Sequence, residues 1–228
     1  MSGIWAAYNK ALAKNPLFVK AMTSLTGFTV GDILAQKFIS PNENYDFART
    51  VRLGTFGGLV HGPTGHYFYG MLDARLPGTK PITVATKVAI DQTIWNPIFG
   101  VMFFTYLGLT EGKSMGDIQK KIKNDLATAV MGSWTVWIPA HTVNFAFVPT
   151  SQRLLYINTI QIGYNIFLSF LGNKKVDDTP AGEGDKDSKY GADQVIDQAK
   201  ALLKNERPAL EKLGVDMRTV EEKGRGTK

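Results

Sequence analysis

The residues of this sequence that could do chemistry are polar side chains set in long stretches with few charges. If those stretches cross a membrane, their ionisable groups are costly there and should face a bundle interior or a water-filled cavity. We therefore expect a hydrated polar cavity lined by Asp32, Gln36, His66, Asp91, Gln92, His141 and Asn144. His61 and Asn96 belong to the same polar group, and each residue taken singly could instead make a structural hydrogen bond. Asp32 and Asp91 lie near expected helix ends, where each could pair with Arg49 or Arg52.

Enzymatic and metal chemistry is not indicated. The 228-residue chain has no cysteine, which excludes a thiol nucleophile, a disulfide and any Cys-ligated zinc or iron–sulfur site. Three histidines are few for a multi-histidine metal centre, and neither Gly-x-Ser-x-Gly nor His-Glu-x-x-His occurs. Gly108–Ser114 is one residue short of a phosphate-binding loop and follows an apolar stretch, so it predicts a helix stop and a turn. We expect no catalytic residue, no cofactor and no metal.

Charge is unevenly distributed along the chain. Of 26 Lys and Arg and 20 Asp and Glu, residues 172–228 hold 12 of each, which leaves 14 basic and 8 acidic residues for 1–171. This division predicts three parts: an amphipathic N-terminal helix over 1–15, a helical bundle over 16–173 and a charged soluble extension over 174–228. The first part places Ile4, Trp5, Tyr8 and Leu12 on one face, which is typical of a helix lying on a membrane surface.

Four stretches contain no Asp, Glu, Lys or Arg and are long enough to cross a membrane as helices: 53–72, 92–110, 126–152 and 154–173. About 20 residues of helix cross the roughly 30 Å hydrocarbon core, and backbone groups in lipid must be satisfied within the segment. A fifth segment, 17–39, contains Lys20, Asp32 and Lys37, so it is either another span or a helix lying partly at the interface. The sequence predicts an all-α, multi-span transmembrane bundle of four to five membrane helices.

A four-residue spacing recurs among glycines of the first two predicted helices: Gly27, Gly31, Gly54, Gly58 and Gly62. Small residues at this spacing let helix backbones approach closely in a membrane. We interpret them as tight helix contacts, with a pore seam as the alternative. Three prolines, Pro63, Pro97 and Pro139, lie inside uncharged stretches, so helices should begin or kink there.

The extension contains a small apolar stripe. Isolated helices of about 12–15 residues are marginal in water, so this stripe should lie against another protein or against the body of the chain. Its net charge of zero makes an anionic lipid surface a weaker candidate than a protein groove. We expect a protein partner there, membrane lipid around the bundle and no nucleic acid. The expected docking residues are Val195, Ile196, Leu202, Leu203, Leu210 and Leu213.

Several motifs over residues 1–173 together resemble one family. They are Trp5-Ala-Ala-Tyr8, Gly31-Asp32 with Gln36, Arg49-x-x-Arg52, Gly62-Pro63-x-x-His66-x-x-Tyr69, Asp91-Gln92 with Pro97, Trp134-x-x-Trp137, Asn144-Phe145-x-x-Val148-Pro149 and Arg153. This set resembles the Mpv-seventeen family, also called the peroxisomal-membrane-protein-twenty-two family. The chain departs from the family's Trp-Pro-x-x-Gln at Trp137-Ile138-Pro139-Ala140-His141, and it has Phe68 where Trp is common.

The resemblance implies a small multi-span helical protein of the mitochondrial inner or the peroxisomal membrane, without enzymatic activity. Members are proposed to be channels for small solutes or metabolites, so a channel is the first functional hypothesis. The second is a non-catalytic accessory subunit of a larger membrane complex, docked through the extension. The first 31 residues are basic and free of acidic side chains, which favours the mitochondrion.

Overall fold

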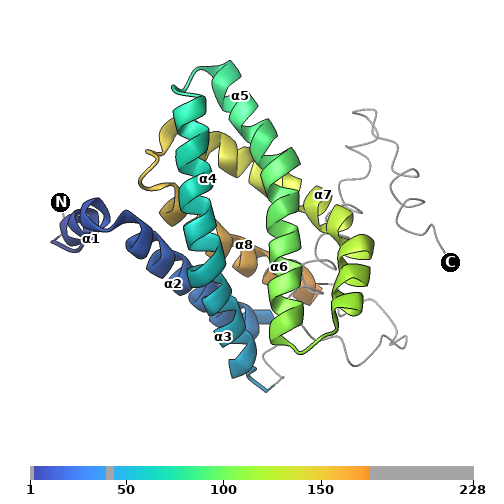
Figure 1. The fold of residues 1–228 in the computed structure, drawn as a ribbon. Helices are drawn as coiled ribbons and strands as arrows, with labels where there is room; N and C mark the ends of the chain where they lie inside the picture. The colour runs from blue at the N-terminus through green and yellow to red at the C-terminus, as the bar shows by residue number, and fades with distance from the viewer. Residues whose placement is uncertain (1–2, 40–43, 175–228) are drawn as a thin grey trace. The chain divides into compact units, whose positions relative to one another are not determined.

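The structure, a computed structural model, describes residues 3–39 and 44–174 (Figure 1). In chain order its elements are α1 (Gly3–Lys14), α2 (Pro16–Ile39), α3 (Phe47–Phe56), η1 (Gly57–His61), α4 (Gly62–Arg75), α5 (Pro81–Ile90), η2 (Asp91–Trp95), α6 (Asn96–Thr110), α7 (Met115–Phe147) and α8 (Arg153–Lys174). Both η1 and η2 are short stretches of π-helix. The all-α prediction is confirmed over the described residues. The extension beyond Lys174, with the six predicted docking residues from Val195 to Leu213, lies outside them.

The described chain divides into two compact units. The first contains residues 3–91, apart from 40–43, together with 138–174, and the second contains residues 92–137. The sequence predicts one bundle over 16–173, whereas the structure groups the middle of this range separately. Both boundaries fall at helix irregularities, η2 and Pro139, where the regular backbone hydrogen-bond ladder is interrupted.

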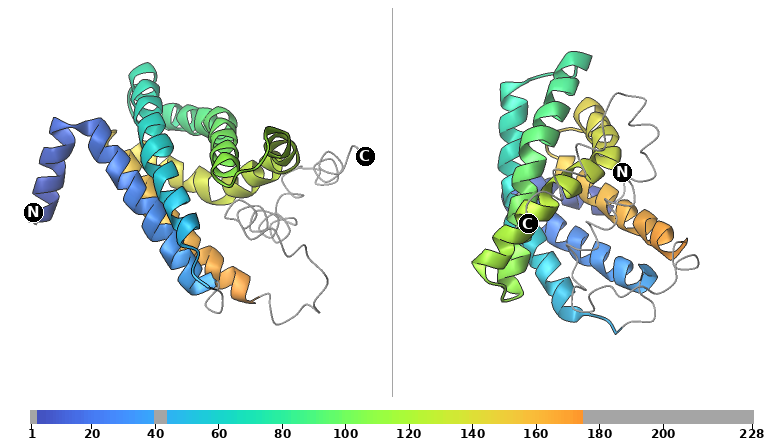
Figure 2. Two further views of the ribbon diagram at one scale, coloured as in Figure 1. Left: turned by 60° about the horizontal axis from the view of Figure 1, so that its bottom comes forward. Right: turned by 90° about the vertical axis from the view of Figure 1, so that its right-hand side faces the viewer.

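In the first unit, α2 and α8 lie side by side (Figures 1 and 2). α2 also packs against α3, η1 and α4. Pro16 is the first residue of α2, where its missing N–H would have no helical acceptor in any case. The Asp46 carboxylate caps α3 by accepting from the Arg49 N–H at 2.9 Å. The apolar core of this unit includes Phe56, Tyr69, Phe145, Leu154 and Ile157.

Helix α1 is attached to the first unit mainly by polar contacts. Only Leu12 of this helix is buried, and Ile4 is exposed. The Tyr8 hydroxyl lies 3.3 Å from Thr23 Oγ1, and the amide of Gln152 donates to that of Asn9 at 2.5 Å. The apolar side chains of the predicted surface-lying helix are therefore left mostly uncovered by the described residues.

Two prolines account for the π-helical stretches. Pro63 and Pro97 lie in the first turns of α4 and α6, directly after η1 and η2. A proline within a helix clashes with the carbonyl four residues back and lacks an N–H donor. In η1 the turn is widened, and the Gly62 N–H bonds to Gly57 O, five residues back. Helices thus begin at two of the three predicted positions, whereas Pro139 lies inside α7.

The packing of α2 against η1 and α4 depends on glycine. A Cβ atom at Gly57 would lie 2.5 Å from Ser24 O, and one at Gly62 would lie 2.6 Å from Ala21 Cα. At Gly58 the nearest atoms belong to the flexible Leu25 side chain, at 3.1 Å. Because η1 adds a residue to the turn, the glycines that meet the α2 backbone are five residues apart instead of four.

The other predicted packing glycines also lie in this unit. A Cβ at Gly54 would meet the side chain of Thr29, and one at Gly27 would lie 2.8 Å from Cβ of Asn158. Gly31 is buried in α2. α2 therefore approaches η1–α4 on one side and α8 on another through positions without side chains.

The second unit is built around a helical hairpin of α6 and residues 115–137 of α7. A Cβ at Gly108 would lie 2.5 Å from Ile118 Cγ1, so the two helices are close near the turn. The turn contains Gly112, whose φ of 74° suits glycine, and Ser114 caps α7 by accepting from the Asp117 N–H at 3.2 Å. The near-match to a phosphate-binding loop is thus a helix stop, a turn and a helix cap.

Among the described helices, only α2 is long and apolar enough, over Pro16–Lys37, to cross a membrane as a single α-helix. The finer prediction of four to five spans is therefore not confirmed. The uncharged stretch 53–72 is divided among α3, η1 and α4, and 92–110 is divided between η2 and α6. α2 corresponds to the segment 17–39, which the sequence allowed to be either a span or an interfacial helix because it contains charged residues. Two of those residues, Lys20 and Asp32, are buried.

Candidate functional site

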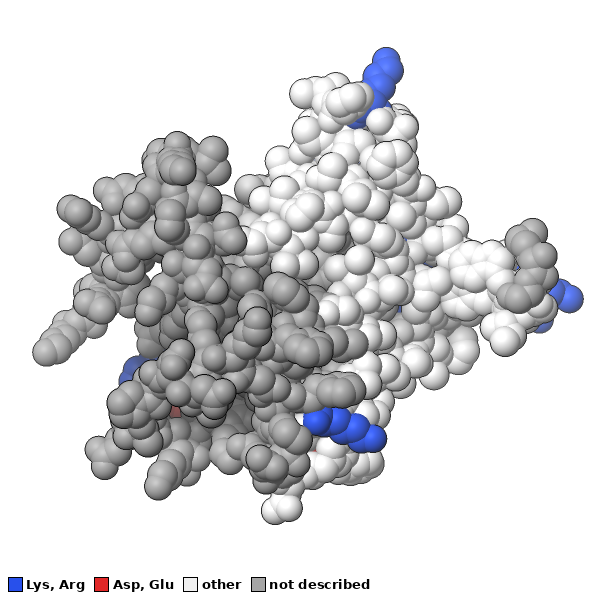
Figure 3. All heavy atoms as spheres, turned by 180° about the vertical axis from the view of Figure 1, so that it is seen from behind, with Lys and Arg blue, Asp and Glu red and all other residues white. Residues whose placement is uncertain are grey.

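The first unit buries charged side chains and exposes large apolar ones. Lys20, Lys87 and Arg153 are between 2% and 5% exposed, and Asn144 is fully buried. By contrast, Leu59 is 71% exposed and Ile82 is 74% exposed. In the face drawn in Figure 3, the described surface is almost entirely uncharged, with Lys and Arg at its margins. Soluble proteins almost never bury charged residues without partners, so the role of this interior depends on what each group contacts.

A row of α2 side chains at four-residue spacing carries the polar groups of this interior: Lys20, Ser24, Asp32 and Gln36, with Phe28 between the two pairs. Because a helix has 3.6 residues per turn, this row winds slowly around α2. Lys20, Ser24 and Asp32 are buried. The row makes three separate sets of contacts in the first unit: one at Lys20, one at Ser24 and one at Asp32 and Gln36.

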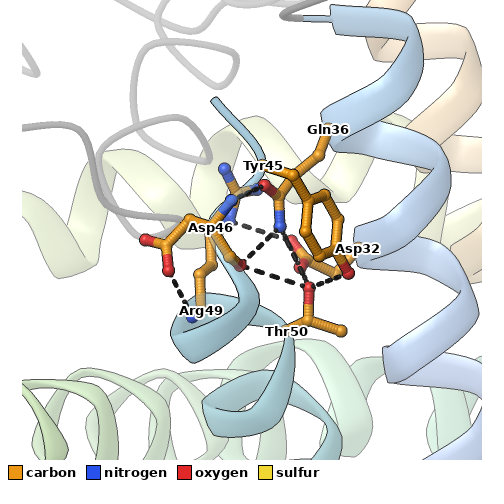
Figure 4. Close-up of polar contacts among 6 residues, drawn as sticks. All are labelled: Asp32, Gln36, Tyr45, Asp46, Arg49 and Thr50. Atoms are coloured by element: carbon orange, nitrogen blue, oxygen red, sulfur yellow. Dashed lines mark hydrogen bonds and ion pairs between the residues drawn. The ribbon is translucent and has the colours of Figure 1, made fainter. Parts of the chain in front are cut away.

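At the C-terminal end of α2, Asp32 and Gln36 hold the start of α3 (Figure 4). Asp32 pairs with Arg49 through Oδ1 and Nε at 2.8 Å, and its Oδ2 accepts from Thr50 at 2.6 Å. The Gln36 amide donates to Asp32 at 2.7 Å and to the Asp46 carbonyl at 3.0 Å, and it accepts from the Asp46 N–H at 2.7 Å. The buried carboxylate is thus neutralised and the turn is fixed.

This network assigns two predicted cavity residues a structural role. Gln36 uses both its donor and its acceptor on neighbouring groups, and the pairing of Asp32 with Arg49 is the alternative that the sequence left open. Removing one partner of such a pair leaves a buried charge uncompensated, which is strongly destabilising. The network at the α2–α3 junction therefore holds the start of α3 against the end of α2.

In the middle of α2, Ser24 joins three elements. The Asn158 amide of α8 donates to Ser24 Oγ at 3.1 Å, and His61 Nδ1 of η1 lies 3.1 Å from the same oxygen. Asn158 also donates to the Leu154 carbonyl at 2.7 Å. All three polar side chains are buried. They form a neutral hydrogen-bonded layer across α2, η1 and α8.

A second layer surrounds Asp91 at the end of α5. The Tyr69 hydroxyl hydrogen-bonds to the Asp91 carboxylate, and His141 Nε2 lies 3.5 Å from its Oδ2. The His141 ring stacks against Tyr69 and Phe145, with centroids 6.0 and 5.6 Å away. Asn144, one turn further along α7, has no hydrogen-bond partner for either amide atom among the described residues. This layer brings together two of the predicted cavity residues, Asp91 and His141, and Asn144 lies one turn from His141.

The most highly charged set lies where α4 ends and α8 begins, and we call it the Asp73 cluster: Asp73, Lys87, Thr150 and Arg153. Asp73 pairs with Lys87 at 2.7 Å and with Arg153 at 3.2 Å. Thr150 donates to the same carboxylate. Lys87 also donates to the Gly78 carbonyl at 3.2 Å. One carboxylate therefore serves two buried cations and a hydroxyl.

The remaining predicted cavity residues, Gln92 and His66, make other contacts. Gln92 belongs to the second unit, where its side chain accepts from Asn96 at 3.2 Å and its carbonyl accepts from the Trp134 indole at 3.3 Å. His66 is half-buried in α4 with its ring against Tyr67. Within the first unit, the predicted set is therefore distributed over the α2–α3 junction, the Asp91 layer and α4.

The Asp73 cluster is not among the residues predicted from the sequence, although helical periodicity indicates one of its members. Val84, Lys87, Val88 and Asp91 have the i, i+3, i+4, i+7 spacing of a buried helical stripe, so Lys87 should face inward with them. Among the described residues, no group of three or more His, Asp and Glu is placed to hold a metal ion. The buried groups can bind and orient polar solutes or water through hydrogen bonds and charge.

Comparison with known proteins gives the family. Residues 108–169 match the Mpv17 / PMP22 family model. The chain is 34% identical to "PXMP2/4 family protein 4" of Dictyostelium discoideum over 71% of this chain and 89% of that protein. It is 39% identical to "Protein SYM1" of Mycosarcoma maydis over 64% of this chain and 75% of that protein.

A third relative, "Protein sym-1" of Neurospora crassa, is 34% identical over 73% of this chain and 98% of its own length. About a quarter of this chain therefore has no counterpart in that relative. No solved structure matches the chain. The uncharged stretches, the exposed apolar surface and the relatives agree, and the chain belongs to the Mpv17/PMP22 family of organellar membrane proteins.

Proposed function

We propose that this protein is a non-enzymatic channel for small solutes in the mitochondrial inner membrane, with the buried polar groups of the first unit along its pathway. The observation that supports this most directly is that the first unit buries charged side chains and exposes large apolar ones. An apolar surface suits lipid, and buried ionisable groups in membrane proteins normally line cavities or solute paths. Asn144 supports the proposal further, because its amide is fully buried and its described surroundings leave both polar atoms unpaired.

The direct test is flux through the purified protein. Liposomes containing the protein should release potassium, inorganic phosphate and small dicarboxylates faster than protein-free liposomes. Absence of flux for every solute in this panel, with the protein shown to be inserted, would contradict the channel. Fractionation of mitochondria into outer and inner membranes tests the location, and recovery with the outer membrane or with peroxisomes would contradict it.

The proposed topology has five spans, over 17–39, 53–72, 92–110, 126–152 and 154–173. Because the chain has no cysteine, single cysteines can report sidedness without background labelling. In sealed vesicles, a cysteine at Thr79 should react with a membrane-impermeant maleimide from one side and a cysteine at Ser114 from the other. Labelling of both from the same side would exclude this topology. The alternative function, an accessory subunit docked through the extension, depends on residues outside the described ones.

A further inference from the structure

We propose that Lys20 and Arg153, at the edge of the Asp73 cluster, bind a small anion that carries a phosphate or carboxylate group. This inference rests on the proposed function and names the class of solute that its pathway would hold. It comes from three observations: buried donors without acceptors, a surplus of positive charge, and a fixed orientation of the guanidinium.

The first observation is that donors outnumber acceptors. Lys20 is 5% exposed, and its only described partner is the Thr150 carbonyl, 3.5 Å from Nζ. An ammonium group has three hydrogens to donate, so most of its capacity is unused. Arg153 pairs with Asp73 through Nη2, and its buried Nε and Nη1 have no hydrogen-bond partner among the described residues. These donors have no described protein acceptor and are available to an anion.

The second observation is the balance of charge. Lys87 and Arg153 share the single carboxylate of Asp73, and Lys20, the third buried cation, contacts Thr150, whose hydroxyl donates to the same carboxylate. Asp91 is the next buried carboxylate of the first unit, and it already accepts from Tyr69 and contacts His141. Even when Asp91 is counted, the cations exceed the carboxylates by one. Asp32 does not change this balance, because it is neutralised by Arg49 at the other end of α2.

The third observation concerns how Arg153 is held. Its Cζ lies 4.7 Å from the centroid of the Phe145 ring, so the guanidinium is supported by that ring while Nη2 is anchored on Asp73. A guanidinium fixed in this way presents its remaining N–H groups in one plane, which matches the oxygens of a carboxylate or phosphate. Lys20 contacts the Thr150 carbonyl, and the Thr150 hydroxyl and Arg153 both bond to Asp73, so the two cations adjoin one Thr150–Asp73 group and repel one another. An anion between them would convert that repulsion into attraction.

The test measures equilibrium binding of radiolabelled inorganic phosphate to the full-length protein in phosphatidylcholine nanodiscs, with chloride at matched ionic strength. We expect saturable binding to the wild type. Loss of one charge-assisted hydrogen bond should weaken it about tenfold or more in Lys20→Gln and Arg153→Lys. Arg153→Lys keeps the charge and can still pair with Asp73, so it should fold, but it lacks the planar arrangement of N–H donors. It therefore tests the site even if Lys20→Gln does not fold. Lys121→Gln is the matched control, because Lys121 pairs with Asp125 in the second unit at 3.3 Å, and it should bind like the wild type.

A second series replaces part of the phosphatidylcholine with phosphatidylglycerol, because a lipid headgroup carries the same phosphate chemistry. If the anionic lipid displaces phosphate, and Lys20→Gln retains less of that lipid, the anion site stands and its occupant is a headgroup. If the lipid has no effect, the occupant is a soluble anion. The inference is overturned if the wild type shows no saturable binding, or if Lys20→Gln and Arg153→Lys both bind like Lys121→Gln. Flux on the same preparations separates the two proposals, since flux without phosphate binding removes the site and leaves the channel.

Discussion

The close contact of Gly62 with α2 gives the sharpest prediction of this structure. In Gly62→Ala, the new methyl group would lie 2.6 Å from Ala21 Cα and 3.2 Å from the Lys20 carbonyl oxygen. Both neighbours are backbone atoms and cannot rotate away. An ordinary contact needs 3.4–4 Å, so α2 must move by about 1 Å relative to α4.

The magnitude follows from two opposed effects. Alanine is a better helix former than glycine by about 0.5–1 kcal/mol. Overpacking a close contact costs about 1–3 kcal/mol, and here it also disturbs the Lys20 and Ser24 contacts on the same helix. We expect Gly62→Ala to lower the free energy of unfolding by about 1–2 kcal/mol. Gly70, in the same helix, has nothing within 4 Å of a Cβ position, so Gly70→Ala should be stabilising by up to about 1 kcal/mol.

The assay is unfolding of purified variants in one detergent, by temperature and by denaturant. Gly70→Ala is the matched control, because it makes the same chemical change in the same helix. Gly58→Ala should lie between the two variants, since it meets only the Leu25 side chain. If Gly62→Ala is as stable as Gly70→Ala, the backbones of α2 and α4 are not in contact at this position and the packing described above is incorrect.

Three further variants test the polar interior. Asp73→Asn leaves Lys87 and Arg153 without their carboxylate, so it should lower the free energy of unfolding by about 3–5 kcal/mol. Adding Lys87→Met should recover part of that loss. An Asp73→Asn protein of wild-type stability would contradict the ion pairing. His141→Ala should change flux into liposomes at equal protein amounts, because the ring lies in the Asp91 layer; unchanged flux would exclude it from the pathway. Asn144→Leu removes an amide without described partners, so it should keep wild-type stability while reducing flux, whereas a large loss of stability would show that the amide is bonded in the fold.

The parts of the fold that were predictable depend on local chemistry. Pro16 marks a helix start because proline suits a first turn, and the pairing of Asp32 with Arg49 could be anticipated because both lie near helix ends. The four-residue glycine spacing selected Gly54, Gly58 and Gly62, and each of them lies close to α2. It did not select Gly57, which meets the α2 backbone because η1 adds a residue to the turn. The extra residue in this turn is a consequence of Pro63, which lies in the first turn after η1. A fixed four-residue spacing assumes a regular α-helix and does not include it.

The Asp73 cluster was missed for a different reason. Counting uncharged stretches treats a charged residue as the end of a helix, so Asp73, Lys87 and Arg153 fell between the expected helices. In the structure, Lys87 and Arg153 are buried in the first unit, and Asp73 is 15% exposed. Helical periodicity places Lys87 on the same face as Val84 and Val88 and so predicts that it faces inward. Counting charges along the chain does not give this information.

The arrangement of contacts along α2 determines which variants can separate folding from conduction. At the α3 end, Asp32 is fully paired, so changing it affects the fold first. Near the other end, Asp73 pairs with two cations. A loss of flux on changing Asp73 could therefore follow either from the loss of these ion pairs or from a blocked path. Lys20 and Asn144 differ from both, because they are buried but contribute few described bonds to the fold. With stability retained, an effect on flux at these two positions would therefore report on the polar interior itself and not on the fold.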